Sequence, residues 1–256
     1  MPTKTDLNVT FPPAAERGLD QDEEWCRVRV DGAERTIRFH DYHEIYDVPG
    51  LYERIFHEHL ECRSPAEVVG LLGERLSAEG TDPAELSVLD VGAGNGIVGE
   101  ELRALGVRAV VGADILREAA VAAARDRPGV YDDYLACDLT ALTDDERRRL
   151  AAESPNCLTT VAALGFDDMP PEAFQAAYDL ITDDGWIAFN IKGDFLEAED
   201  TTGFRRLIVA LIRSGALEVR DRREYRHRLS IHRDPLDYVA VVGRKRPPRS
   251  RFRRLT

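Results

Sequence analysis

Three glycines and one carboxylate lie close together in the stretch Asp90-Val-Gly92-Ala93-Gly94-Asn95-Gly96. Glycine has no Cβ, so a loop rich in it turns tightly and lets a ligand approach the backbone closely. When such a loop leads into a helix, the free N–H groups and the positive end of the helix dipole attract polar ligand atoms. We therefore expect residues 90–96 to form the centre of a ligand-binding site.

The glycine spacing distinguishes between two common cofactors. The dinucleotide fingerprint Gly-x-Gly-x-x-Gly would place its third glycine at position 97, which is isoleucine here. The carboxylate of Asp90 would repel a pyrophosphate and attract a cation that carries an ammonium and a sulfonium. We therefore predict S-adenosylmethionine as the cofactor, with S-adenosylhomocysteine as the product. An NAD-dependent oxidoreductase is one alternative, and a non-catalytic protein that binds S-adenosylmethionine is another.

Two further carboxylates follow the next two apolar runs of the chain. Asp114 ends the run Val110-Val-Gly-Ala-Asp114, about 20 residues beyond the glycine loop, where a carboxylate accepts hydrogen bonds from ribose. We expect Asp114 and the adjacent Ile115 to hold the ribose. We expect Asp138 and Leu139, at the end of the third run, to contact the adenine. A helix cap is the alternative role for Asp114, and an exposed loop acid for Asp138.

These residues need a sheet to bring them together, and the apolar patterning from residue 87 onward predicts one. Short apolar runs alternate with helical patterns, which is typical of a Rossmann-like, doubly wound α/β sheet. The expected strands are Ser87–Val91, Arg108–Asp114, Tyr134–Asp138, Cys157–Ala163, Trp186–Ile191, Leu217–Leu229 and Tyr238–Gly243. Helices are expected at 97–105, 116–126, 144–153 (with a capping box from Thr143 to Glu146) and 171–183, and in a segment with Phe204, Leu207, Ile208, Leu211 and Ile212 on one face.

The residues before this domain divide into two parts. Residues 1–22 are polar and are predicted to form a flexible arm. Residues 23–63 are predicted to form a β-hairpin around Asp31-Gly32 and then two helices separated at Pro49-Gly50. Ser64, Pro65 and Glu67 predict a capping box that begins the cofactor-binding domain at 64–245. Residues 246–256 are expected to be a basic tail, although the run of basic residues starts at Arg244.

Aromatic and histidine side chains in this N-terminal segment are candidates for the acceptor side of the site. The rings of Tyr42, Tyr46 and Tyr52 would exclude water and face a sulfonium, and ordinary helix packing is the alternative. The catalytic residues are unknown, but His40, His43 and Tyr42 are candidates for a general base. Isolated histidines near helix starts are more often structural.

The composition limits the partners. The net charge is −13, and an acidic surface repels phosphate backbones, so nucleic acid is not expected as a partner. The four cysteines form no Cys-x-x-Cys pair, which argues against a zinc site. No apolar run is long enough for a membrane span, and no signal peptide is visible, so we expect a cytoplasmic protein. A small-molecule acceptor is the prediction, and the oligomeric state is unknown.

The motifs Asp-Val-Gly-Ala-Gly-Asn-Gly (90–96), Gly-Ala-Asp-Ile (112–115) and Ala-Cys-Asp-Leu (136–139) resemble motifs I to III of class I S-adenosylmethionine-dependent methyltransferases. The stretches 161–166, 170–174 and 185–192, with His40-Asp41-Tyr42 and residues 46–52, are similar to the Williams-Beuren syndrome region methyltransferase-like group and its bacterial relatives. This resemblance implies a seven-stranded sheet whose last strand is antiparallel. It implies no particular methyl acceptor.

Two residues after the fourth and fifth strands complete the predicted acceptor side, namely Phe166 and Asn190. Asp167, Asp168 and Asn190 also stand where catechol-type O-methyltransferases hold a divalent metal, and oxygen ligands suit Mg²⁺. The match is loose and loop acids are common, so we expect no metal. The stretch Ala-Leu-Gly-Phe166-Asp lacks the Asn/Asp-Pro-Pro-aromatic loop of amino-methylating nucleic-acid enzymes, and the chain lacks the Pro-Cys pair of cytosine C5 enzymes.

Overall fold

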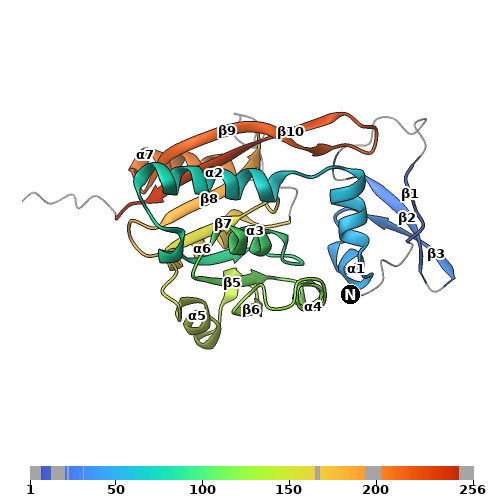
Figure 1. Ribbon diagram of the computed structural model, residues 1–256, viewed down its shortest axis with the longest axis horizontal. Coiled ribbons are helices and arrows are strands. Elements are labelled where there is room, and N and C mark those ends of the chain that lie inside the picture. Colours follow the sequence, from blue (N-terminus) through green and yellow to red (C-terminus); the bar gives the residue numbers. More distant parts are fainter. Residues whose placement is uncertain are drawn as a thin grey trace, which may run out of the picture.

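A seven-stranded sheet forms the centre of the fold (Figure 1). The computed structural model describes residues 7–12, 21, 23–30, 32–164, 168–193 and 203–247. The strand order is β6-β5-β4-β7-β8-β10-β9, and β10, the last strand in the chain, runs antiparallel to both of its neighbours. The strands are β4 (Ser87–Val91), β5 (Ala109–Asp114), β6 (Asp133–Ala136), β7 (Cys157–Thr160), β8 (Trp186–Lys192), β9 (Leu217–Leu229) and β10 (Pro235–Lys245). The predicted fold class is therefore confirmed.

Helices cover both faces of the sheet, which explains why its central strands are almost entirely apolar. In β4, Leu89 and Val91 join one buried cluster, while Val88 points to the other. The first cluster is covered by α5 (Asp144–Ala151), α6 (Pro171–Leu180) and α7 (Phe204–Ser214), and the second by α2 (Ser64–Glu79) and α3 (Ile97–Leu105). The remaining helix of this domain, α4 (Arg117–Asp126), follows β5 and packs against β5 and β6.

The observed elements lie close to the predicted ones. β4 and α3 have the expected bounds, and the capping box from Thr143 to Glu146 is present. β7 ends at Thr160 instead of Ala163, because the backbone turns to a positive φ of 55° at Ala162. Ile212 is 43% exposed, which corrects its predicted place on the buried face of α7. It lies at the margin of the apolar stripe that Phe204, Ile208 and Leu211 form.

The N-terminal segment folds as a separate layer at one end of the sheet, beside α4 and the β9–β10 turn (Figure 1). Strands β2 (Trp25–Val30) and β3 (Ala33–Arg38) form the predicted hairpin, and β1 (Val9–Thr10) pairs with β2. Helix α1 (Tyr42–Asp47) is separated from a π-helical segment, η1 (Glu53–His59), by the turn at Pro49-Gly50. Ile231, from the β9–β10 turn, belongs to the apolar cluster of this layer.

Two expectations about the ends of the domain need correction. Ser64 does not cap α2, because Arg63 is the N-cap residue and the Ser64 side chain is buried among polar groups of the sheet. Arg244 and Lys245 belong to β10, so the run of basic residues begins inside the fold. Of the predicted arm and tail, residues 1–6, 13–20, 22 and 248–256 lie outside the described residues. Among the described residues, no helix combines the length and apolar composition that a membrane span needs.

Candidate active site

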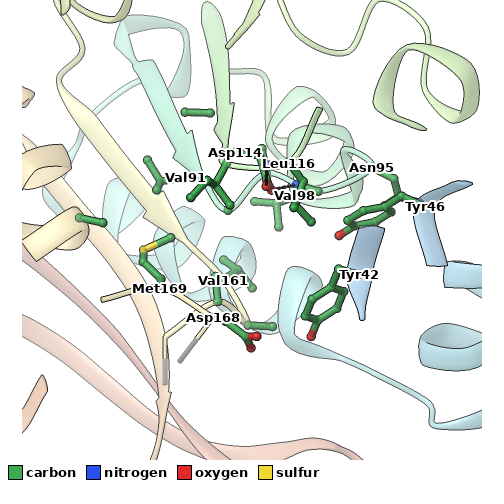
Figure 2. Close-up of a pocket in the computed structure, with 18 of the residues that line it drawn as sticks. Tyr42, Tyr46, Val91, Asn95, Val98, Asp114, Leu116, Val161, Asp168 and Met169 are labelled. Atoms are coloured by element: carbon green, nitrogen blue, oxygen red, sulfur yellow. Dashed lines mark hydrogen bonds between the residues drawn. The ribbon is translucent and has the colours of Figure 1, made fainter. Parts of the chain in front are cut away.

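A cavity of about 430 Å³ opens at the carboxyl ends of β4, β5, β6 and β7 (Figure 2). Its volume falls within the range of roughly 300–1,000 Å³ that is usual for small-molecule sites. The strand order reverses at β4, which pairs with β5 on one side and β7 on the other. Ligands of open α/β sheets bind at such a reversal point. The N-terminal segment supplies the opposite wall, so the cavity lies between the sheet and this segment.

The glycine loop between β4 and α3 forms the floor of the cavity. Gly92, Gly94 and Gly96 have φ values of 68°, 53° and 92°, a region that residues with a Cβ rarely adopt. A Cβ on Gly92 would lie 2.6 Å from the Cβ of Ala163, and one on Gly94 would lie 2.5 Å from the hydroxyl of Tyr46. Glycine is therefore needed in this loop both for its backbone conformation and because Ala163 and Tyr46 leave no room for a Cβ. Gly92, Ala93, Gly94 and Asn95 line the cavity, whereas Gly96 caps α3 behind it.

Asp114 faces the cavity and also fixes the glycine loop. Its carboxylate accepts hydrogen bonds from the backbone N–H of Gly94 at 3.0 Å and of Leu116 at 3.0 Å. Burial raises the pKa of Asp114, and these backbone hydrogen bonds oppose that rise. Ile115 and Leu116 line the cavity beside it. Because Leu116 is the N-cap residue of α4, the bond from its N–H lets Asp114 stabilise the start of that helix, although Asp114 is not the cap itself.

Asp138 and Leu139 lie on the rim of the cavity, with Cys137 and Thr140. The Asp138 Oδ1 atom accepts hydrogen bonds from the backbone N–H of Thr140 at 2.8 Å and from its hydroxyl at 2.7 Å. These bonds begin the short 3-10 helix η3 (Leu139–Ala141) and lower the pKa of Asp138. Leu139 is 7% exposed and gives this rim an apolar surface. A negative charge and an apolar side chain are therefore adjacent here.

Asp90 is not among the residues that line the cavity, contrary to its predicted place beside the ligand. It lies beneath the glycine loop at 1% exposure, where its carboxylate accepts hydrogen bonds from Thr159 Oγ1 and Tyr131 Oη, both at 2.7 Å. Burial raises its pKa to about 6. The side chain alternates with Val91 along β4 and so faces away from the cavity. Asp90 therefore supports the glycine loop from below and does not itself line the cavity.

Asn190 also lies outside the cavity, which corrects its predicted role on the acceptor side. Its Oδ1 atom accepts a hydrogen bond from the backbone N–H of Ala162 at 2.6 Å, and Ala162 does line the cavity. Its Nδ2 group donates to Ser64 Oγ at 3.0 Å and to Tyr225 Oη at 2.7 Å. Asn190 therefore shapes the wall from behind, and its amide oxygen is not directed at a metal. Phe166 and Asp167 lie outside the described residues.

Tyr42, Tyr46 and Tyr52, the three tyrosines predicted to exclude water, do line the cavity. Their rings follow one another, with centroid distances of 6.1 Å between Tyr42 and Tyr46 and 5.3 Å between Tyr46 and Tyr52. Burial raises the pKa of all three hydroxyls, so they stay neutral at physiological pH. Figure 2 shows Tyr42 and Tyr46 across the cavity from the strand ends. Arg125 of α4 secures this wall by donating to the Tyr46 carbonyl at 3.0 Å.

His40 and His43 both line the cavity, and His40 has a partner that sequence reasoning did not assign to it. The His40 Nδ1 atom lies 2.9 Å from Asp168 Oδ1, although 128 residues separate the two in the chain. The pair joins the N-terminal segment to the sheet domain at the wall of the cavity. Several further lining residues were not predicted as site residues, because apolar or isolated side chains do not by themselves indicate a ligand site; among them are Cys62, Pro65, Ile97, Val98, Leu116, Cys137, Val161 and Met169.

Comparison with known proteins places this geometry in a family. A family model described as a methyltransferase domain matches residues 56–232. A solved structure from Thermoplasma acidophilum has a TM-score of 0.50 at 18% identity, covering 71% of this chain and 87% of that one. A candidate RNA methyltransferase from Pyrococcus horikoshii has a TM-score of 0.52 at 15% identity, covering 73% of this chain and 88% of that one. No curated protein sequence matches the chain significantly.

The match between the family model and the chain covers the glycine loop, Asp114, Asp138 and the His40 partner Asp168. It decides against the NAD-dependent alternative, in agreement with Ile97 at the position of the third dinucleotide glycine. The cavity also fits the cofactor, because it joins an acid at the ribose position to an apolar rim and a glycine floor. The chain therefore belongs to the methyltransferase domain family and is a class I S-adenosylmethionine-dependent methyltransferase with a Rossmann-like fold.

Proposed function

We propose that the protein transfers the methyl group of S-adenosylmethionine to a small-molecule acceptor by direct displacement, in the cavity beneath the tyrosine wall. One observation carries this proposal: the glycine loop, Asp114 and Asp138 line the same cavity as Tyr42, Tyr46 and Tyr52. The first set suits an adenosine with an amino-acid tail. The three tyrosines provide an aromatic wall on the opposite side of the cavity, where an acceptor can bind.

The residues at the strand ends are assigned as follows. The Asp114 carboxylate accepts the ribose hydroxyls, because it lies at the end of the second strand and faces the cavity. Asp138 accepts the adenine amino group, while Leu116 and Leu139 pack against the base. Backbone groups of Gly92 to Asn95 contact the amino-acid tail. S-adenosylmethionine supplies a methyl group that its sulfonium has already activated, so the protein needs no nucleophile of its own.

The protein contributes alignment and the exclusion of water. Holding two reactants in an attacking geometry supplies on the order of 7–11 kcal/mol in well-oriented systems. The rings of Tyr46 and Tyr52 are neutral and buried, and their electron-rich faces attract a sulfonium cation. The glycine loop and this wall approach each other at Gly94, where an added Cβ would lie 2.5 Å from the Tyr46 hydroxyl, so the wall limits the access of water to the loop.

A small molecule is the proposed acceptor because the cavity is covered and the chain is acidic. The net charge of −13 disfavours a nucleic-acid backbone, and a covered cavity of about 430 Å³ leaves limited room beside the cofactor. We further propose that the protein falls in the Williams-Beuren syndrome region methyltransferase-like group, on the motifs at residues 40–52 and 161–192. The names of structural neighbours include both RNA and small-molecule methyltransferases.

The cofactor assignment is tested by isothermal titration with S-adenosylmethionine, S-adenosylhomocysteine and NAD. Asp114→Ala is expected to weaken S-adenosylmethionine binding by about 1–3 kcal/mol, the usual cost of losing hydrogen bonds to a charged group. Asp179→Ala, an exposed residue on α6, is the matched control and should bind as the wild type does. Unchanged affinity in Asp114→Ala would show that the ribose lies elsewhere.

The acceptor class is tested with three separate pools: small metabolites, total RNA and peptides. Each pool is incubated with the protein and S-adenosylmethionine that carries a deuterated methyl group. Mass spectrometry is expected to find the label in the metabolite pool. Label only in RNA or only in peptides would overturn the small-molecule proposal while leaving methyl transfer itself intact.

A further inference from the structure

We infer that His40 and Asp168 act together as the general base of the reaction and that the acceptor is a phenolic or enolic hydroxyl. This inference rests on the proposed function, since it concerns the acceptor end of the same cavity. It assigns a catalytic residue, a positioning residue and a chemical class of substrate. Its basis is a contact between two segments that are remote in the sequence, together with the aromatic surroundings of that contact.

The geometry of the pair is that of an oriented imidazole. His40 Nδ1 lies 2.9 Å from Asp168 Oδ1, and the two side chains are 17% and 20% exposed. A carboxylate at that distance accepts the proton of Nδ1, which fixes the tautomer in which Nε2 carries the lone pair. The same carboxylate stabilises the imidazolium that forms after proton transfer. Asp168 is therefore a positioning residue, and His40 is the residue that meets the acceptor.

The pair lies at the end of the cavity away from Leu116. Both residues line the main cavity, and both also line a smaller cavity of about 30 Å³ that continues behind them. Figure 2 shows Asp168 beside Val161, at the end of the cavity away from Leu116. His40 follows the hairpin and Asp168 precedes α6, so the pair joins the N-terminal segment to the sheet domain. An acceptor at this end lies between the pair and the cofactor.

The walls near the pair favour a planar, apolar acceptor. The Tyr42 ring lies edge-on to the His40 ring at 5.8 Å, and it also stacks on Phe56 at 6.1 Å. Tyr52 packs on Phe56 at 4.7 Å and lines the same cavity. Aromatic acceptors pack well against such rings. A planar hydroxyl compound therefore matches both the surface and the base.

A base is required only for an acceptor that keeps its proton at neutral pH. A phenol has a pKa of about 10, so a nearby imidazole increases its reactivity, whereas a carboxylate acceptor is already ionised. In the reaction, the hydroxyl oxygen forms a bond to the methyl carbon while the bond from that carbon to sulfur breaks. The electron pair of that bond stays on sulfur, which becomes neutral in S-adenosylhomocysteine. The hydroxyl proton moves to His40 Nε2 and then to solvent.

Among the described residues, the charged and titratable groups that line the space behind the pair are held in states unsuited to a base. Arg228 is paired with Glu24 at 2.6 Å, and burial raises the pKa of Tyr42 and of Tyr238 (the latter to about 12). His227 is buried against Ser64, and burial lowers its pKa well below the usual range. Burial also raises the pKa of the Cys62 thiol. His43 lines the main cavity from α1 but does not line the space behind the pair.

The test compares phenol with 4-nitrophenol as methyl acceptors for the wild type and for His40→Gln. The assay is run at pH 8, where phenol keeps its proton, whereas 4-nitrophenol is largely ionised without help. We expect His40→Gln to lower kcat by about 10²- to 10⁴-fold with phenol, the usual range for general-base catalysis. With 4-nitrophenol the loss should be much smaller. Asp168→Asn should also lower kcat more with phenol than with 4-nitrophenol, but by less than His40→Gln does. His232→Gln, in the β9–β10 turn, is the matched control.

A second readout needs no turnover. The protein is loaded with S-adenosylhomocysteine and mixed with 4-nitrophenol near the pH at which that phenol is half ionised, and the visible band of the phenolate is measured. Binding to the wild type is expected to increase the ionised fraction, because His40 accepts the proton. His40→Gln should lose this increase while still binding S-adenosylhomocysteine with wild-type affinity.

Three results would overturn the inference. One is an equal loss with both phenols in His40→Gln, which would indicate a packing role. Another is a protein that methylates amines, thiols or carboxylates but neither methylates nor binds any phenol. The third is an unchanged phenolate band in the wild type. Each differs from failure of the proposed function, in which the titration would show no binding of S-adenosylmethionine at all.

Discussion

At the residue scale, three aspartates with similar sequence settings have different environments. Asp90, Asp114 and Asp138 each lie within two residues of the carboxyl end of a sheet strand. Asp90 is buried under the glycine loop, Asp114 faces the cavity while holding Gly94, and Asp138 is exposed on the rim. The physical difference is desolvation, which raises the pKa of Asp90 and Asp114, whereas hydrogen bonds from Thr140 lower that of Asp138. One residue type thus supports the loop from below, lines the cavity and places a charge on its rim.

Burial of Asp90 gives the protein a specific pH dependence of stability. Its pKa is about 6 in the folded protein and about 3.9 in an unfolded chain. The folded state therefore binds more protons between pH 4 and 6, so stability falls as the pH rises through this window, by up to about 3 kcal/mol. Asp90→Asn lacks this titration. The free energy of unfolding of both proteins is measured in urea at pH 4.5 and 7.5. The difference between Asp90→Asn and the wild type should shift in favour of the variant at the higher pH. An equal change in both proteins between the two pH values would contradict the prediction.

The position of Gly94 predicts an effect on cofactor binding. Gly94→Ala introduces a Cβ 2.5 Å from the Tyr46 hydroxyl at a φ of 53°, so it should strain the loop and displace the tyrosine wall. Gly106→Ala is the matched control, because Gly106 has a φ of 95° but no atom within 4 Å of the added Cβ. Both variants should lose roughly 1–2 kcal/mol of stability from the left-handed backbone. Only Gly94→Ala should also bind S-adenosylmethionine more weakly, as measured by calorimetry.

At the element scale, the N-terminal segment is fixed to the glycine loop and α4 by polar contacts around one carboxylate. Glu53 Oε1 accepts hydrogen bonds from Asn95 Nδ2 at 2.6 Å and from Arg127 Nη1 at 2.9 Å. Arg125 adds the bond to the Tyr46 carbonyl described above. The glycine loop and the tyrosine wall are therefore joined. Under the proposed function, the release of the cofactor requires these contacts to break.

Glu53→Gln tests this coupling between the wall and the loop. The amide keeps the shape of the side chain but removes its negative charge, which weakens the bonds from Asn95 and Arg127. Losing about 1 kcal/mol of docking energy should speed the dissociation of S-adenosylmethionine by about three- to tenfold. Stopped-flow chase experiments measure this rate. The control is Glu58→Gln, which alters an exposed pair with Arg54 and should release S-adenosylmethionine at the wild-type rate. Equal dissociation rates in the wild type and both variants would argue against the coupling.

At the scale of the whole molecule, the last residues of β10 close the sheet domain. The Arg244 guanidinium lies 3.7 Å from the centre of the Trp186 ring, and the Lys245 ammonium donates to the carbonyls of Tyr178 and Ile181 at the end of α6. Arg246 pairs with Glu218 and Asp184. Positive charge at a helix C-terminus is stabilising. The start of the basic run is therefore structural.

Two truncations separate this structural part from the remaining residues. Deleting residues 248–256 should leave the free energy of unfolding within about 0.5 kcal/mol of the wild type. Deleting residues 244–256 also removes the contacts to Trp186 and α6, and should cost about 2–4 kcal/mol. Urea denaturation measures both values. Equal stability of the two truncated proteins would show that Arg244 to Arg246 contribute nothing to the fold.

The sequence by itself determined the sheet domain, because its signals are local. Apolar runs, helix starts and the glycine loop at 92–96 depend on near neighbours, so β4, α3 and the class of cofactor followed from residue order. The ends of parallel strands meet at one edge, which also brought Asp114 and the Asp138 rim to the same cavity.

Only the tertiary structure decided where side chains from different elements meet. It turned Asp90 and Asn190 away from the cavity, because Asp90 accepts a hydrogen bond from Thr159 on the neighbouring strand β7 and Asn190 donates to Tyr225 on β9, two strands away. It joined His40 to Asp168 across 128 residues. Pairing between remote segments depends on how whole elements pack, and no local pattern of residues encodes that packing.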